Sequence, residues 1–278
     1  MAFTVIPFAP ITLDAHNPSP MTGEGNHTYL IAGDAGDATL VDAGVGHRDH
    51  LAAIARGLDE RNARLKTVVV THGHADHASG APELAAAHPH ARFVKKPWPS
   101  EDAKYRVDWQ PIGEGSRIAG AELLVVETPG HSPDHIALWH APTRTIFTGD
   151  LVVSGSSVMI HASRGGNLGD YLRSLDRILA LEPRMLLPAH GPAVDGPKAI
   201  ADLIRGYIDH RLMRERQVID ALARGHATVQ AIADYIYDGL DAALMPAARE
   251  NVQAHLDKLA AEQRAANHEG TWTTSSTS

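Results

Sequence analysis

The chain has 278 residues, of which 44% are hydrophobic, and it carries a net charge of -8 and no cysteine. The lack of cysteine excludes disulfides, thiolate metal ligands and cysteine nucleophiles, so any metal must bind through His, Asp or Glu. The acidic balance argues against a general affinity for nucleic acid or for an anionic membrane surface. The first residues lack a basic segment and no apolar run approaches the roughly 20 residues of a membrane span, so we expect a cytoplasmic protein without a membrane partner.

Short apolar runs alternate with amphipathic segments over the first two thirds of the chain. The runs predict strands within 28–44 (two strands around a Gly/Asp turn), 67–70, 121–130, 145–150 and 185–191. Helical spacing of apolar residues predicts helices over 48–63, 81–90 and 168–183. Strands that alternate with helices are typical of a layered α/β domain.

The pattern changes near residue 199, where strand-like runs stop. Helices are predicted over 199–225, 228–240 and 245–265, with Thr228 as N-cap and Pro246 in a first turn. The final residues are polar and low in complexity, which is typical of a disordered tail. We therefore predict an α/β domain over 1–198, a small all-α domain over 199–268 and a disordered tail over 269–278.

The segment "THGHADH" follows the apolar run that ends at Val70, and it places four metal-ligand side chains together. His72 and His74 are two apart, so at an extended strand end both imidazoles point to the same side. Asp76 and His77 follow at the turn into the next helix. Zinc and similar ions take neutral imidazole nitrogen and carboxylate oxygen, so this segment predicts a metal site.

Three further candidate ligands each come at the end of a predicted strand. His131 closes "ETPGH", Asp150 closes "TIFTGD" and His190 closes "LLPAH", each beside a Gly or Pro that turns the chain. A lone histidine after a strand is more often structural. Four such segments together supply the six or seven ligands that a pair of metal ions needs, so we predict a dinuclear site.

The motifs "THGHADH", "TPGHSPDH", "FTGD" and "PAHGP" resemble, in this order, the metal motifs of the metallo-β-lactamase superfamily. The resemblance covers about residues 26–192 and implies an αββα sandwich with the metals at one edge. It implies that His72, His74 and His131 hold one metal and that Asp76, His77 and His190 hold the other. Asp150 would bridge both metals.

A narrower resemblance rests on three segments, near the start, in the middle and in the C-terminal third of the chain. "NPSPMTGEGNHTYLIAG", "PGHSPDH" and "YIDHRLMRERQVIDAL" resemble the β-lactamase-like protein 2 group, in which a small winged-helix-like domain follows the hydrolase domain. That group contains endoribonucleases and thioesterases as well as other hydrolases. The resemblance therefore implies a hydrolase without naming its substrate.

Two adjacent metal ions would activate a water and polarise the substrate oxygen, which predicts hydrolysis. Asp76 is a candidate catalytic residue because it can orient the water and take its proton. His135 is a second candidate, either as a donor to the developing oxyanion or as a support for a ligand. Asp42 and Asp134 fit supporting roles better than ligation. Nitrogen and oxygen ligands favour two divalent ions, most simply Zn, although Mn or Fe would also fit.

Two substrate classes stay open at this point, and so does the oligomeric state. The favoured one is a small-molecule ester or thioester; the alternative is single-stranded RNA, cleaved by a metal-dependent endoribonuclease. RNA would need a basic track, and 95–109 is the one segment where Lys, Arg and aromatic residues gather. Residues 199–268 hold eight Lys/Arg against ten Asp/Glu, and the arginines of its first helix, Arg211 among them, are predicted to lie on a solvated face.

Overall fold

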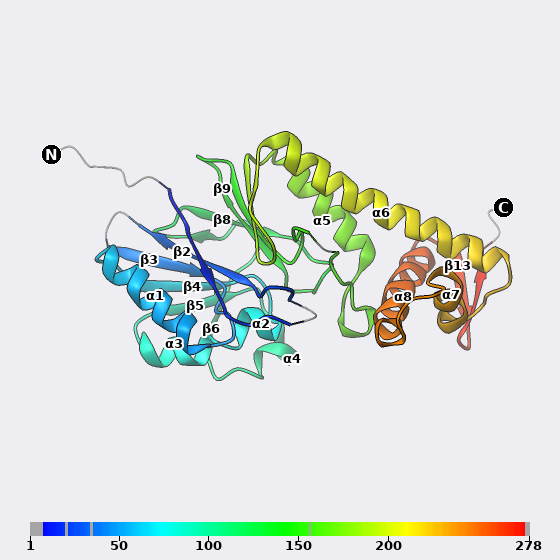
Figure 1. Ribbon diagram of the computed structural model, residues 1–278, viewed down its shortest axis with the longest axis horizontal. Coiled ribbons are helices and arrows are strands. Elements are labelled where there is room, and N and C mark those ends of the chain that lie inside the picture. Colours follow the sequence, from blue (N-terminus) through cyan, green and yellow to red (C-terminus); the bar gives the residue numbers. More distant parts are fainter. Residues whose placement is uncertain (1–7, 20–21, 34–35, 156, 276–278) are drawn as a thin grey trace. The chain divides into compact units, whose positions relative to one another are not determined.

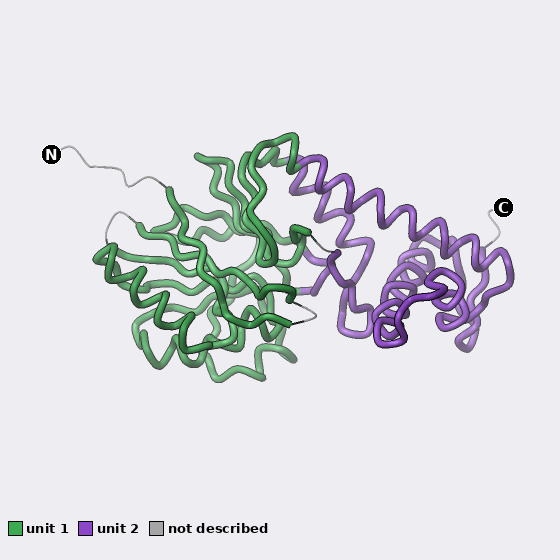
Figure 2. The backbone as a smooth tube through the Cα atoms, viewed as in Figure 1, with its two compact units in different colours: residues 1–128, 134–156, 181–200 green, residues 129–133, 157–180, 201–278 purple. Residues whose placement is uncertain are grey.

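The computed structural model describes residues 8–19, 22–33, 36–155 and 157–275, which form two compact units (Figure 2). Unit 1 takes in the chain up to Thr128, residues 134–156 and residues 181–200. Unit 2 takes in 129–133, 157–180 and the chain from Ala201 onward. The boundary predicted at 198/199 falls inside one helix, α6 (Pro197–Ala223), and stays a prediction.

Unit 1 contains two six-stranded sheets (Figure 1). The first sheet has the order β1 (Ile11–Asp14), β2 (His27–Ala32), β3 (Asp37–Val41), β4 (Arg64–Val70), β5 (Arg92–Lys95), β6 (Trp109–Pro111). The second has the order β12 (Val194–Asp195), β11 (Met185–Pro188), β10 (Thr145–Gly149), β9 (Ile136–His140), β8 (Leu123–Glu127), β7 (Arg117–Ile118). Strands β3 to β6 pair in parallel, so their carboxyl ends meet at one edge.

Both faces of the first sheet are buried, and alternate residues of each strand point to opposite faces. Val41 and Val69 pack in one cluster with Leu123 and Phe147 of the second sheet. The opposite face packs with α1 (Arg48–Glu60) and α3 (Ala81–Ala87), which supply apolar residues such as Ile54. Burial on both faces explains why β4 reads as the continuous run "TVVV".

All the strands and helices predicted for this region are present, although the sheets also contain strands that the sequence did not indicate. Strand β9 is fully buried, as is β10 beside it. Its sequence "IALWH" has no alternation of apolar and polar residues and only one β-branched residue, Ile136. It places His135, the residue before it, against the end of β10.

Unit 2 contains α5 (Leu168–Ala180), most of α6, α7 (Val229–Ile236) and α8 (Met245–Ala261), with two short 3-10 turns, η1 (Ala162–Arg164) and η2 (Ala242–Leu244). Thr228 caps α7 by accepting a hydrogen bond of 3.1 Å from the Ala231 amide. Val218, Ile232 and Leu256 represent the three helices that share one apolar core. The three predicted C-terminal helices are confirmed. Among the described residues, no helix is both long enough and apolar enough to cross a membrane.

The helical C-terminal domain also contains two strands that the sequence did not indicate, one of them within the stretch predicted as a disordered tail from 269. Strands β13 (Ala265–His268) and β14 (Thr271–Thr274) form an antiparallel hairpin. The hairpin is held because Trp272 is buried in the core of unit 2 and its amide donates to the Ala227 carbonyl at 2.7 Å. The polar composition concealed this single apolar anchor. Residues 276–278 lie outside the described residues.

The prediction of a solvated arginine face on the first C-terminal helix is also wrong for one of its members. Arg211 on α6 is only 2% exposed. Arg216, five residues further along, is exposed as expected.

Candidate metal centre

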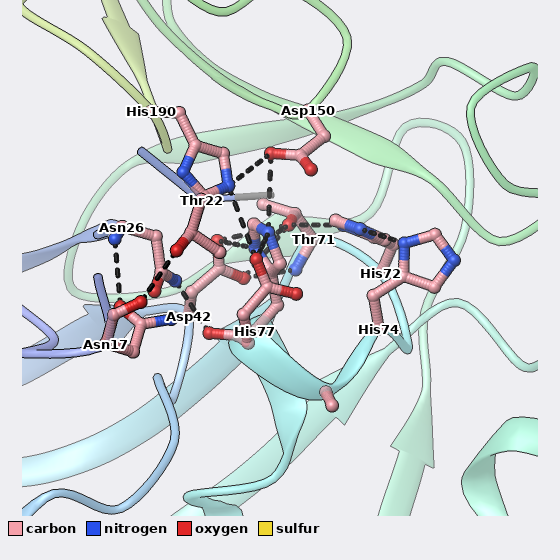
Figure 3. Close-up of polar contacts among 12 residues, drawn as sticks. Asn17, Thr22, Asn26, Asp42, Thr71, His72, His74, His77, Asp150 and His190 are labelled. Carbon is pink, nitrogen blue, oxygen red and sulfur yellow. Dashed lines mark hydrogen bonds and ion pairs between the residues drawn. The ribbon is translucent and has the colours of Figure 1, made fainter. Parts of the chain in front are cut away.

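Four predicted ligands of unit 1 converge on one another. Figure 3 labels three of them, His77, Asp150 and His190. Asp76, His77, Asp150 and His190 each offer a ligand atom, and these atoms lie within 4.8 Å of one another. His77 Nε2 lies 3.4 Å from Asp76 Oδ2 and 3.3 Å from Asp150 Oδ1. His190 Nε2 lies 3.3 Å from the same two oxygens. The imidazole nitrogens and carboxylate oxygens therefore point at one small volume.

The His77 ring is fixed from behind by a buried carboxylate. Asp42 follows β3 and is 2% exposed, and its Oδ2 accepts a hydrogen bond of 2.8 Å from His77 Nδ1. Its Oδ1 accepts the Thr71 amide at 2.8 Å, at the end of the neighbouring strand β4. Asp42 thus sets both the tautomer and the orientation of His77, leaving Nε2 for a ligand, in line with the supporting role predicted for it.

The residues just before β2 support the same cluster. The Gly25 carbonyl lies 3.2 Å from His190 Nδ1, which orients this ring in the same way as Asp42 orients His77. The side-chain amide of Asn26 donates to the Asp76 carbonyl at 2.6 Å. Asn26 is fully buried. Sequence reasoning assigned no chemical role to Asn26, because its partner lies 50 residues away.

The contacts of His135 favour one of the two roles that the sequence left open for it, the support of a ligand, over donation to an oxyanion. The ring is fully buried; its Nδ1 lies 2.8 Å from Thr128 Oγ1, and its Nε2 accepts the Asp150 amide at 3.1 Å. Because Nε2 is an acceptor here, Nδ1 carries the proton and donates it to Thr128. No N–H of this ring is left to donate to a substrate oxyanion. His135 holds the backbone of Asp150, which is the support role that the sequence left open.

The other predicted ligand group begins with His72 and His74, whose Nε2 and Nδ1 lie 3.0 Å apart. The amide of Gly73 between them donates to Asp134 Oδ2 at 2.7 Å. Lys95 Nζ lies 3.0 Å from that same oxygen, and both side chains of this ion pair are buried. The ion pair therefore fixes the backbone between the two histidines.

His131, predicted as the third ligand of this group, lies in the 129–133 segment of unit 2. Its Nδ1 lies 2.9 Å from the Met159 carbonyl. A carbonyl only accepts, so Nδ1 carries the proton and the lone pair is on Nε2, the form that binds metals. Its place beside His72 and His74 stays a prediction.

The pKa shifts of the ligand side chains show that the cluster favours additional positive charge. Burial lowers the pKa of His77, but the carboxylates of Asp76, Asp42 and Asp150 raise it more, so this pKa lies well above its ordinary value. Burial likewise lowers the pKa of His190, and Asp76 and Asp150 raise it above the ordinary value. Burial raises the pKa of Asp76, but the two histidines hold it far below its usual range.

The same groups provide a test of whether a metal fits. Among the described residues, the buried Nε2 of His77 has no hydrogen-bond partner, although it faces two carboxylates. A buried nitrogen in this situation is costly unless a proton or a cation joins it to the carboxylates. Nitrogen and oxygen donors of this kind suit Zn, Mn or Fe. The residues therefore fit a divalent metal ion.

The one candidate for a basic track, residues 95–109, does not present a row of free cations. Lys95 is 1% exposed and bonds Asp102 at 2.5 Å as well as Asp134. Lys96 pairs with Glu127 at 2.6 Å, and Lys104 pairs with Glu101 at 2.5 Å. Most of the positive charge of residues 95–109 is thus already balanced by carboxylates.

Two family models match the chain. The model described as "Metallo-beta-lactamase superfamily" matches residues 21–190, and "Beta-lactamase associated winged helix domain" matches residues 228–272. The first match spans all seven predicted ligands. The second includes α7, α8, β13 and the start of β14.

Individual relatives are similar over most of the chain. A "Beta-lactamase-like protein 2 homolog" of Caenorhabditis elegans is 30% identical over 253 residues, which is 88% of this chain and 81% of the relative. An "Atrochrysone carboxyl ACP thioesterase" of Aspergillus chevalieri is 30% identical over 263 residues, 91% of this chain and 81% of the relative. The crystal structure of a beta-lactamase domain protein from Burkholderia ambifaria aligns with a TM-score of 0.78 at 21% identity, covering 95% of this chain and 90% of that one.

Proposed function

The chain belongs to the metallo-beta-lactamase superfamily and carries its associated winged helix domain, and from this premise we propose that it hydrolyses a small-molecule ester or thioester with two divalent metal ions. The family confirms the expected αββα fold with a C-terminal winged helix, and it makes the protein a hydrolase. The single observation that carries the proposal is the convergence of Asp76, His77, Asp150 and His190 within 4.8 Å.

The proposed division of the ligands is the one that the resemblance implies. Asp76, His77 and His190 would hold one ion; His72, His74 and His131 would hold the other; Asp150 would contact both. When bound, the ions supply an activated water and polarise the substrate carbonyl. Zinc is the proposed metal because these ligands satisfy it without redox chemistry.

Asp76 is the proposed catalytic residue of the chain itself. Its side chain is 23% exposed, whereas His77 beside it is fully buried. A carboxylate at the edge of the cluster can accept the proton of the attacking water and pass it to the leaving group. The position of the Asp76 backbone is set by Asn26, so the carboxylate stays directed at the cluster.

The charge of the chain and its similarity to a thioesterase favour a thioester or ester substrate over RNA. The net charge is -8, and the cations of the one basic segment are largely paired. An RNA strand would require several unpaired cations along one track. The relative named as a thioesterase aligns with 91% of the length of this chain.

The test is metal analysis of the purified protein together with a hydrolysis panel. The panel contains acyl thioesters, aryl esters and a labelled single-stranded RNA, each with and without chelator. Asp150→Ala serves as the inactive variant, and Asp108→Ala, at an exposed position, serves as its matched control. We expect two Zn per chain and thioester or ester cleavage that chelator abolishes.

Two results would overturn parts of the proposal. Chelator-sensitive cleavage of the RNA alone would replace the substrate class with the endoribonuclease alternative. Two Fe per chain without hydrolysis of any substrate would replace the reaction class with redox chemistry.

A further inference from the structure

Residues 157–161 of unit 2 form an irregular segment whose side chains are partly in the core. Val158 is 4% exposed and Ile160 is fully buried, yet the segment belongs to no helix or strand. Buried backbone carbonyls without a ladder partner must be satisfied by side chains or water. Two adjacent carbonyls of this segment are bound by side chains: Val158 by Arg211 and Met159 by His131.

Arg211 is an unusual residue to find buried at this point. Its guanidinium donates through Nη2 to the Val158 carbonyl and through Nη1 to Asn251 Oδ1 at 3.1 Å. In the part of the chain that the structure describes, no carboxylate forms an ion pair with it. A buried cation without a counter-charge is costly, so a folding role alone would be served as well by an apolar residue.

The guanidinium also reaches the loop of His131 by a second route. Its Cζ lies 5.6 Å from the centre of the Tyr171 ring, which is fully buried on α5. Gly130, directly before His131, has φ of +134°, and a Cβ there would lie 2.3 Å from the Tyr171 backbone. The loop therefore lies directly on Tyr171, and its position depends on where Tyr171 is held.

The 3-10 turn η1, which directly follows this segment, is tied to α8. Glu250 accepts the Ser163 amide at 3.0 Å and the Ser163 hydroxyl at 2.7 Å. The segment that binds His131 is thus held by Arg211 of α6, and the turn that follows it is held by Glu250 of α8. Both helices belong to the C-terminal part of the chain.

We propose that Arg211 is a positioning residue for metal binding: through the Val158–Met159 backbone and through Tyr171 it fixes the imidazole of His131 with Nε2 presented to the metal. The inference rests on the proposed function, because it takes His131 as a ligand. It gives the C-terminal helices a role in forming the metal centre.

The test compares Arg211→Met with Arg216→Met in metal titrations of the full chain. Both substitutions remove one positive charge from α6, but Arg216 is exposed. We expect Arg211→Met to bind one Zn with the wild-type affinity and the second at least tenfold more weakly, whereas Arg216→Met binds both as wild type does. Arg211→Lys keeps a donor for the Val158 carbonyl and should restore part of the lost affinity.

Asn251→Ala provides a milder variant in case Arg211→Met fails to fold. It removes one acceptor of the guanidinium, and we expect the same selective weakening to a smaller extent. His131→Ala should bind a single Zn, and adding Arg211→Met to it should change nothing further if both act on the same ion.

The outcomes separate this inference from the proposed function. If the wild-type chain binds fewer than two metal ions, the proposed dinuclear centre fails. If the wild type binds two and Arg211→Met binds both with unchanged affinity, or loses both equally, the positioning role of Arg211 is wrong.

Discussion

The two predicted ligand groups differ in what holds them. The cluster of Asp76, His77, Asp150 and His190 lies wholly in unit 1, and its supports, such as Asp42, also belong to that unit. The other group takes His72 and His74 from unit 1 but His131 from a segment of unit 2. The predicted groups therefore differ in that only one draws all its ligands from a single unit, and we expect unequal affinities for the two ions.

The largest effect is expected at Asp150, because this residue is proposed to belong to both ligand groups. Asp150→Ala removes the carboxylate proposed to contact both ions, so both affinities should fall and hydrolysis should be lost. Metal content and thioesterase activity measure this, with Asp108→Ala as control. Two tightly bound metals with full activity in Asp150→Ala would show that Asp150 does not bridge.

The next largest effect is expected at Lys95, which supports only the His72 and His74 group. Lys95→Met leaves Asp134 buried without its cation, and breaking such a pair costs about 3–5 kcal/mol of unfolding free energy. Urea unfolding measures the loss, and metal titration should show weakening at one ion only.

The double variant Lys95→Met with Asp134→Asn tests the cause. The amide oxygen of Asn can still accept the Gly73 amide, while the uncompensated charge is gone. We expect most of the stability and of the metal affinity to return. If the double variant stays as unstable as Lys95→Met, the ion pair is not the reason for the loss.

Asp42→Asn should weaken the self-contained cluster instead. Partners that orient metal-binding histidines typically contribute 10–100-fold in metal affinity, and we expect about tenfold here. Metal titration should show the change for the ion held by His77 and little change for the other. Equal weakening of both ions would contradict the division into two independently supported sites.

The smallest effect is a dependence on pH in the metal-free protein. The pKa of His77 and of His190 is raised in the folded state, so the stability these groups contribute is complete below the unfolded value of 6.5 and is lost as pH rises through the folded values. Thermal unfolding in chelator should therefore show a Tm that falls as pH rises above 6.5. Metal-loaded protein should lack this fall, because the ions take the place of the protons.

The sequence was sufficient for features that local pattern determines. Helix periodicity and the apolar run "TVVV" predicted the sheets and helices around the site, and the strand-end histidines and aspartates indicated the candidate ligands because each motif is contiguous. The resemblance implied a division of these candidate ligands between two ions, which spacing alone did not determine.

The supports could not be predicted, since each joins residues far apart in the chain. Lys95 meets Asp134, and Asn26 meets Asp76, only after the sheets have formed. Arg211 was assigned to solvent because charged neighbours surround it in sequence, whereas its carbonyl partner lies 53 residues away. His135 carried the right residue type for catalysis, and only its two contacts show that both nitrogens are occupied.

Gly130 has a consequence for how this chain can change during evolution. Its positive φ and the closeness of the Tyr171 backbone leave no space for any side chain. A saturation library selected for activity should therefore return only glycine at this position, while exposed Arg216 should accept many residues. New substrate specificities would have to arise by mutations at other positions, because every substitution of Gly130 is expected to abolish activity.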